Sequence, residues 1–137
     1  QLRYAEAEAS RKILRSPFQG LMLEILVEKG SAVNQFETYA EIAPSGPMTV
    51  RTEVDELFAG RLSKGLDADI RYIGSDSTVA RGKVIFLSPY LKKKSLFSQK
   101  ANDQEDRLVR EVRILLEGDN GLIMNSKVES VIKLKNN

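Results

Sequence analysis

The stretch SPFQGLMLEILVEKGSAVN, residues 16–34, decides how the chain folds. Its proline prevents a helix from continuing into it, because the residue before a proline is held towards extended geometry. Beyond the proline, apolar residues occupy every second position: Leu21, Leu23, Ile25 and Val27. A period of two is typical of a half-buried strand. The stretch therefore predicts two short extended segments, each followed by a glycine turn, at Gly20 and at Gly30.

The second glycine turn carries a lysine, Lys29, which has two interpretations. A carrier domain holds biotin or lipoate on a lysine in an exposed turn between its two halves. Lys29 stands in VEKGSAV, without the methionine, or aspartate and alanine, that usually flank such a lysine. The alternative is a solvated turn lysine beside a glycine chosen for positive φ, which leaves the module as a scaffold without cofactor chemistry.

The composition excludes several kinds of chemistry. The chain has 137 residues, 42% hydrophobic and 29% charged, which fits one ordinary globular domain or two small ones. It contains no histidine and no cysteine, so it has no Ser-His-Asp or Cys-His nucleophile, no thiol redox pair and no zinc held by those residues. A net charge of +2 does not by itself indicate nucleic acid. There is no signal-peptide pattern and no apolar run of about 18 residues. Because the chain starts at Gln1, we expect a fragment of a longer protein.

The rest of the chain predicts further strands and little helix. Residues 2–12 form a helix in which a narrow apolar seam fits either the end of a coiled coil or a lone solvated helix. Asp55 is a candidate N-cap for a short helix with an apolar stripe at Leu57, Phe58 and Leu62. Residues 107–117 fit either a helix or a strand, and their β-branched side chains favour a strand. The other predicted strands are 36–43, 48–54, 66–72, 79–87 (central in a sheet) and 128–134, with a polar loop at 90–106. This pattern predicts seven to nine strands in a closed or nearly closed β-barrel that follows a small β-module.

Two groups of charged residues could carry chemistry. The run Lys92–Lys94, with Tyr90 and Phe97 nearby, could contact phosphate or anionic lipid, but a solvated loop is the favoured interpretation. Asp67 and Asp69 project from one strand face and could form a paired-carboxylate site. Basic residues close in sequence make a mixed-charge outer face the favoured interpretation. The glycines form no phosphate-binding loop, and the sequence predicts no catalytic residue.

The order of four motifs resembles the HlyD-type membrane-fusion proteins, also called periplasmic adaptors. ILRSPFQGLMLEILVEKGSAV, residues 13–33, is similar to the second half of the lipoyl-like domain of that family. Residues 50–72 look like the barrel segment in which an acidic residue opens a short helix, and GKVIFLSP, residues 82–89, matches a GxVxxIxP strand. DRLVREVRILLE, residues 106–117, resembles a strand of the DevB-like adaptors that serve ABC exporters.

This resemblance implies a fold and a division of the chain. The fold is mainly β: a lipoyl-like half domain, or barrel-sandwich hybrid, followed by a small β-barrel with one short helix. Residues 1–12 would be the stub of a coiled-coil helical hairpin, 13–46 the second lipoyl half and 47–137 the adaptor barrel. Without the first lipoyl half, residues 13–43 would expose strand edges, so we expect them to self-associate or to be poorly ordered. The site residues implied are structural turn glycines only: Gly20, Gly30 and Gly65.

The resemblance also implies a function. The protein would be a non-enzymatic adaptor without a cofactor, located in the periplasm and attached to the inner membrane through a region absent from this chain. Its partners would be an inner-membrane transporter, in particular an ABC exporter, an outer-membrane channel and further copies of itself in a ring, with no nucleic acid. Two other classes remain as alternatives: a biotinyl- or lipoyl-carrier subunit that uses Lys29, and a small nucleic-acid-binding barrel that uses Lys92–Lys94.

Overall fold

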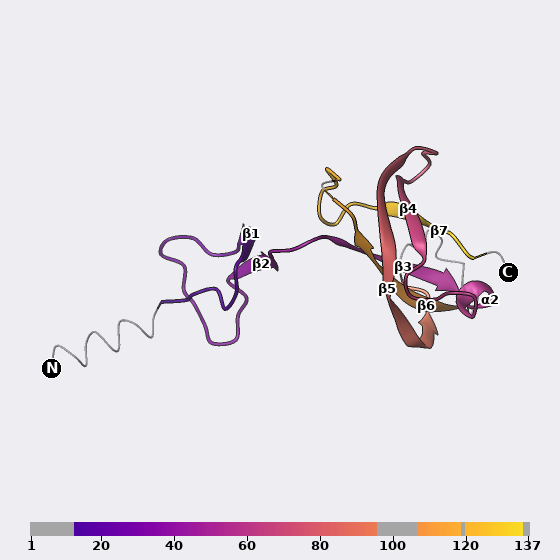
Figure 1. The fold of residues 1–137 in the computed structure, drawn as a ribbon. Coiled ribbons are helices and arrows are strands. Elements are labelled where there is room, and N and C mark those ends of the chain that lie inside the picture. The colour runs from indigo at the N-terminus through magenta and orange to yellow at the C-terminus, as the bar shows by residue number, and fades with distance from the viewer. Residues whose placement is uncertain (1–12, 96–106, 119, 136–137) are drawn as a thin grey trace. The chain divides into compact units, whose positions relative to one another are not determined.

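The chain consists of two compact units, Gln1–Gly46 and Pro47–Asn137, which we call unit 1 and unit 2. The structure, a computed structural model, describes residues 13–95, 107–118 and 120–135 (Figure 1). The predicted N-terminal helix at 1–12 and most of the predicted loop at 90–106 lie outside these residues. The described part of the chain is mainly β with one short α-helix, as the period-two pattern predicts.

Unit 1 contains an antiparallel pair of strands, β1 (Gly20–Ile25) and β2 (Ala40–Pro44), with a bulge between Met22 and Glu24. Between the strands, Ser31 donates its backbone N–H to the carbonyl of Glu28 at 3.0 Å, which closes a turn around Lys29 and Gly30. The sequence predicts a strand at 36–43, but β2 begins only at Ala40, because residues 36–39 belong to the loop that connects the two strands. All six residues of β1 are exposed, so unit 1 encloses no core in the described residues.

Unit 2 is a five-stranded antiparallel sheet in the order β3-β6-β5-β4-β7. Its elements are β3 (Thr49–Asp55), α2 (Glu56–Ala59), β4 (Asp67–Tyr72), β5 (Thr78–Lys93), β6 (Leu108–Leu116) and β7 (Val128–Ile132). Strand β5 lies in the middle of the sheet, as its apolar sequence predicts, and it is the long curved ribbon of Figure 1. Two register shifts bend it where it pairs with β6.

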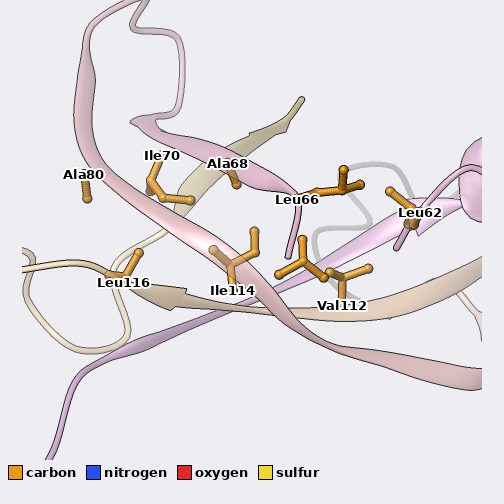
Figure 2. Packing of buried hydrophobic residues seen from close by; sticks show 9 residues of the cluster. Leu62, Leu66, Ala68, Ile70, Ala80, Val112, Ile114 and Leu116 are labelled. Carbon is orange, nitrogen blue, oxygen red and sulfur yellow. The ribbon is translucent and has the colours of Figure 1, made fainter. Parts of the chain in front are cut away.

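A single hydrophobic core holds unit 2 together. The largest side chains that are less than 2% exposed are Ile70, Val84, Val112 and Ile114. Burying a side chain of this kind contributes roughly 1.5–3 kcal/mol. Figure 2 shows the core side chains of β4, β5 and β6 converging with Leu62 and Leu66, which follow α2. Residues of both edge strands, including Val50 of β3 and Ile132 of β7, pack against the same cluster. All five strands therefore share one core, and in the described residues the sheet is open, because β3 and β7 do not pair with each other.

Several local predictions are confirmed. The carboxylate of Asp55 accepts a hydrogen bond from the backbone N–H of Leu57 at 2.9 Å and caps α2. Residues 108–116 form a strand, β6, and three of its four buried side chains, Val112, Ile114 and Leu116, belong to the core cluster. The β-branched residues favour this outcome because they pack well on a pleated surface.

Two predictions are wrong, each for a tertiary reason. Residues 90–93 are part of β5 instead of a loop, because they pair with β6, where Leu91 lies opposite Arg110. The predicted apolar stripe of α2 is not buried as a unit. Leu57 is 80% exposed and Phe58 is 51% exposed, and among the three residues of that stripe only Leu62 reaches the core.

The three glycines predicted in turns have different settings. Gly30 and Gly65 have φ of 93° and 86°, a region that favours glycine. Gly20 instead begins strand β1. A side chain there would place its Cβ 2.2 Å from the carbonyl oxygen of Ala43, so glycine permits a close approach of the two strands.

Candidate functional site

The most buried charged group of unit 2 is a network across three adjacent strands, which we call the ionic network: Glu53 of β3, Glu111 of β6 and Lys92 of β5. Glu53 and Glu111 lie directly opposite each other in the β3–β6 pair. The Lys92 ammonium contacts Glu111 Oε2 at 2.9 Å and Glu53 Oε1 at 3.3 Å. The backbone N–H and hydroxyl of Ser95 donate to the Glu53 carboxylate at 2.9 and 2.6 Å. Lys92 thus bridges two carboxylates that would otherwise repel each other, and the Arg113 guanidinium contacts Glu111 Oε1 at 3.3 Å.

The protonation states of the ionic network follow from this geometry. Hydrogen bonding to Lys92 lowers the pKa of Glu111 below 4.5, although burial opposes the change. The same hydrogen bond raises the pKa of Lys92 above 10.5. Both groups therefore stay charged at neutral pH. A general acid or base works best when its pKa lies near the working pH, so the ionic network is suited to fastening strands and unsuited to proton transfer.

A second buried arrangement, the arginine bracket, joins α2 to the bend in β5. The Arg110 guanidinium donates from Nε to the carbonyl of Ser88 at 2.7 Å and from Nη1 to the carbonyl of Ala59 at 3.0 Å. Ser88 is 5% exposed, and its hydroxyl donates to the carbonyl of Tyr90 at 2.9 Å. The bracket joins these elements at the end of the sheet where Leu57 and Tyr90 are 80% and 65% exposed.

The two aspartates predicted as a possible paired-carboxylate site lie on the outer face of β4, each beside its own cation. Asp67 contacts the ammonium of Lys83 at 2.5 Å, and Asp69 contacts Lys133 at 2.8 Å. Hydrogen bonds to these two lysines lower the pKa of each carboxyl. These groups line a shallow cavity of about 300 Å³ together with Arg81, Gly82 and Glu117. The face has three acids and three bases, so it is a mixed-charge surface, and two ionised carboxylates cannot divide acid and base roles.

The lysine run does not form one basic patch. Lys92 belongs to the ionic network, in which the carboxylates of Glu53 and Glu111 balance its positive charge. Lys29 lies exposed in its turn, between Glu28 and Gly30. In the residues that the structure describes, no group of acidic side chains has the arrangement of a metal site. No helix among the described residues is long and apolar enough to cross a membrane.

Sequence reasoning missed both Arg110 and the pair of Glu53 and Glu111. In the sequence each of these residues is one charged position within an alternating strand, which usually faces solvent. Lys92, and the two carbonyls that Arg110 contacts, lie 19 to 51 positions away, so no local pattern could reveal these contacts. The sequence gives one weak signal: Glu111 is the single acidic residue of the segment 108–116, whose remaining residues are apolar or basic.

Unit 1 presents several exposed apolar side chains in the residues that the structure describes. Leu21, Met22 and Ile25 are 60%, 50% and 64% exposed. The most exposed apolar side chain is Phe36, at 97%, and its backbone has a φ of 71°, a left-handed conformation that bulky residues rarely adopt. The adjoining loop is held by Asn34, whose amide donates to Glu37 at 2.9 Å. Such a surface is typical of an interaction site.

Comparison with known proteins identifies the fold. Neither a protein-family profile nor a curated protein matches the sequence. The structure is similar to that of the membrane fusion protein Spr0693 from Streptococcus pneumoniae R6, with a TM-score of 0.62 and 18% sequence identity. The likeness covers 98% of this chain and 55% of that chain, so this chain spans about half the length of its structural neighbour. The shared feature is the fold of part of a membrane fusion protein.

Proposed function

We propose that this chain is part of an adaptor subunit of an export complex, a membrane-fusion protein of the HlyD type. The observation that carries the proposal is the likeness to a membrane fusion protein along nearly the whole chain, 98% of its residues. The four sequence motifs that resemble the HlyD type lie in the same order along the chain, which supports the same conclusion from independent data.

Each unit has a place in this proposal. Residues 13–46 are the second half of a lipoyl-like domain, 47–137 are the adaptor barrel, and 1–12 are the end of a helical hairpin. The exposed strand β1 supports the first assignment, because a half domain leaves apolar strands without their second layer. The curled sheet around one core supports the second.

The proposed role is assembly without catalysis or a cofactor. Lys92 and Glu111 form an ion pair that keeps both ionised, so they hold the barrel rigid while its outer surfaces contact partners. Copies of the adaptor would form a ring between an inner-membrane transporter, of the ABC type, and an outer-membrane channel. The protein would lie in the periplasm and be attached to the inner membrane by a segment outside these residues.

The proposal is tested by recovering the adaptor with its partners. The native protein is tagged in its source cell, cross-linked, extracted from the membrane fraction with detergent and purified, and the copurified proteins are identified by mass spectrometry. We expect subunits of an ABC exporter, enriched over a tagged membrane protein of similar abundance. Recovery of the protein without any transporter would refute the proposal.

Two substitutions then locate the transporter contact on unit 2. Leu57 in α2 and Ile123 between β6 and β7 are similarly exposed, at 80% and 78%, and lie near opposite ends of the sheet. Leu57→Asp should reduce copurification if the bracketed end contacts the transporter, and Ile123→Asp then serves as the matched control. The reverse result assigns the contact to the other end.

The same purified protein is used to test the two alternative functions, a carrier subunit and a nucleic-acid-binding barrel. An adaptor carries no modification on Lys29, so the intact mass should equal the mass calculated from the sequence. A mass increment on that lysine would establish the carrier function instead. Binding to single-stranded nucleic acid that weakens steeply with salt would support the nucleic-acid-binding barrel.

A further inference from the structure

Two arginines, Arg51 of β3 and Arg113 of β6, lie directly opposite each other in unit 2, and we call them the arginine pair. Directly opposite residues of an antiparallel pair point to the same side, with their Cβ atoms about 5 Å apart. Arg113 lies between Val112 and Ile114, whose side chains are in the core, so the arginine pair points to the outer face. Both arginines are exposed there. Two like charges in this position repel each other and destabilise the pairing of the strands.

Arg113 is held in a defined orientation. Its guanidinium lies over the ring of Phe86 of β5, 4.9 Å from the ring centroid, which is a cation–π contact. Its Nε and Nη2 atoms both donate to Glu111 Oε1 at 3.3 Å. An arginine has five N–H donors, so these two contacts leave the other three available. The side chain is 53% exposed, so its remaining donors are accessible from solvent.

Arg51 forms no ion pair with any residue that the structure describes. The acidic residues on the same face are already engaged: Lys92 contacts the carboxylates of Glu53 and Glu111, and Glu111 also contacts Arg113. These groups comprise three cations and two carboxylates, so one positive charge is left over among them. The structure thus places an excess positive charge where two guanidinium groups lie side by side.

We propose that the arginine pair binds one phosphate group. A guanidinium presents its donors as a planar fork, which matches the oxygens of phosphate or carboxylate. One fork satisfies both oxygens of a carboxylate, whereas free phosphate or a phosphate monoester has further terminal oxygens for a second fork. The bound phosphate places negative charge between the two guanidinium groups and replaces their repulsion by attraction. The same group occurs as free phosphate and as the head group of a phospholipid such as phosphatidic acid.

Thermal unfolding in a series of phosphate concentrations measures this binding. Both cations are exposed and screened by salt, so we expect a dissociation constant of about 1 mM for inorganic phosphate at constant ionic strength. Phosphate also stabilises proteins non-specifically by exclusion from their surface, so the comparison of variants decides. Arg51→Gln should weaken the specific effect by at least about tenfold. Without phosphate this variant should unfold at the same or a higher temperature, because the repulsion is removed.

Lys133 supplies the matched control. Its side chain is 56% exposed and follows β7, at the opposite edge of the sheet from β3. Lys133→Gln removes the same charge as Arg51→Gln and should retain the full response to phosphate. Arg113→Lys keeps the charge but loses the fork, so its affinity should be intermediate. If Arg51→Gln and Lys133→Gln respond equally to phosphate, the arginine pair is not a phosphate site and the proposal is overturned.

Vesicles distinguish the two sources of the phosphate group. The chain is sedimented with phosphatidylcholine vesicles that contain phosphatidic acid. Sedimentation that Arg51→Gln abolishes and Lys133→Gln retains assigns the site to a lipid head group. A response to inorganic phosphate without sedimentation assigns it to a soluble phosphate, and the absence of both overturns the proposal. The inference does not rest on the proposed function, because it concerns the purified chain without a transporter.

Discussion

The replacement of Gly82 by alanine tests whether the close contact between β5 and β6 holds unit 2 together. Gly82 is buried in the central strand and lies opposite Ala68 of β4 and Leu116 of β6. A Cβ atom at this position would lie 2.3 Å from the carbonyl oxygen of Leu115 and 2.8 Å from the Cγ2 atom of Ile114. The first of these atoms belongs to the backbone, so a side-chain rotation cannot relieve the clash.

The expected cost follows from the displacement that the clash requires. The central pair of strands must separate, and overpacking of this kind costs about 1–3 kcal/mol. Alanine also restricts the unfolded chain, which offsets about 0.4–1 kcal/mol of that cost. We therefore expect a net loss of about 1–2 kcal/mol. For a domain of about 60–100 residues, each kcal/mol lowers the unfolding temperature by about 4–8 °C. Thermal unfolding followed by circular dichroism measures this difference.

A second glycine supplies the matched control. Gly60 caps the end of α2 at a φ of −72°, and a Cβ atom there would meet nothing within 4 Å. Gly60→Ala should leave the unfolding temperature unchanged or raise it slightly. If Gly82→Ala unfolds at the same temperature as Gly60→Ala, the strands are not in close contact at this position and the reasoning is refuted.

Three further predictions concern the charged groups of unit 2. Lys92→Met leaves the carboxylates of Glu53 and Glu111 without their shared cation, so the unfolding temperature of this variant should fall at neutral pH. The difference from the unsubstituted chain should shrink at low pH, where the two carboxylates become protonated. Thermal unfolding measured over a series of pH values checks this. In the unsubstituted chain, the lowered pKa of Glu111 contributes stability above its ordinary value of 4.5, and this contribution should be lost as the pH falls through the lower pKa of the folded state. Arg110→Met removes the donor to two backbone carbonyls and should destabilise unit 2 by about 2–3 kcal/mol in urea unfolding, whereas a change below about 0.5 kcal/mol would contradict a role in fixing the bend of β5. Asp55→Ala removes the cap of α2 and should cost about 1 kcal/mol in the same assay, while Asp55→Asn should retain most of the stability.

These predictions connect the stability of the barrel to its proposed role. The ionic network joins β3, β5 and β6, and the arginine bracket joins β5 to the end of α2. Both lie near the end of the sheet at which Tyr90 and Leu57 are exposed. An adaptor that transmits contacts between partners needs such rigid support, because binding surfaces on fixed elements lose less conformational entropy on assembly.

The sequence by itself determined the local structure of this protein. The period of two at residues 21–27 predicted β1, and the alternation at 48–54 predicted β3, because side chains of a strand point to opposite faces whatever the strand packs against. The cap at Asp55 was equally predictable, since its hydrogen bond joins residues only two positions apart. The order of motifs further predicted the mainly β fold that the structure shows.

Only the tertiary structure decided which charged residues are buried and where the strands end. Residues 90–93 were predicted as a loop because they begin a largely polar stretch, yet they pair with β6, which satisfies their backbone and makes them part of a strand. The sequence predicts that Glu53 and Glu111 face solvent. In the structure they are largely buried, because Lys92 of strand β5 forms ion pairs with both. The local sequence pattern predicts the alternation of side chains along a strand. The burial of each face depends on residues that are distant in the sequence and become neighbours only when the chain folds.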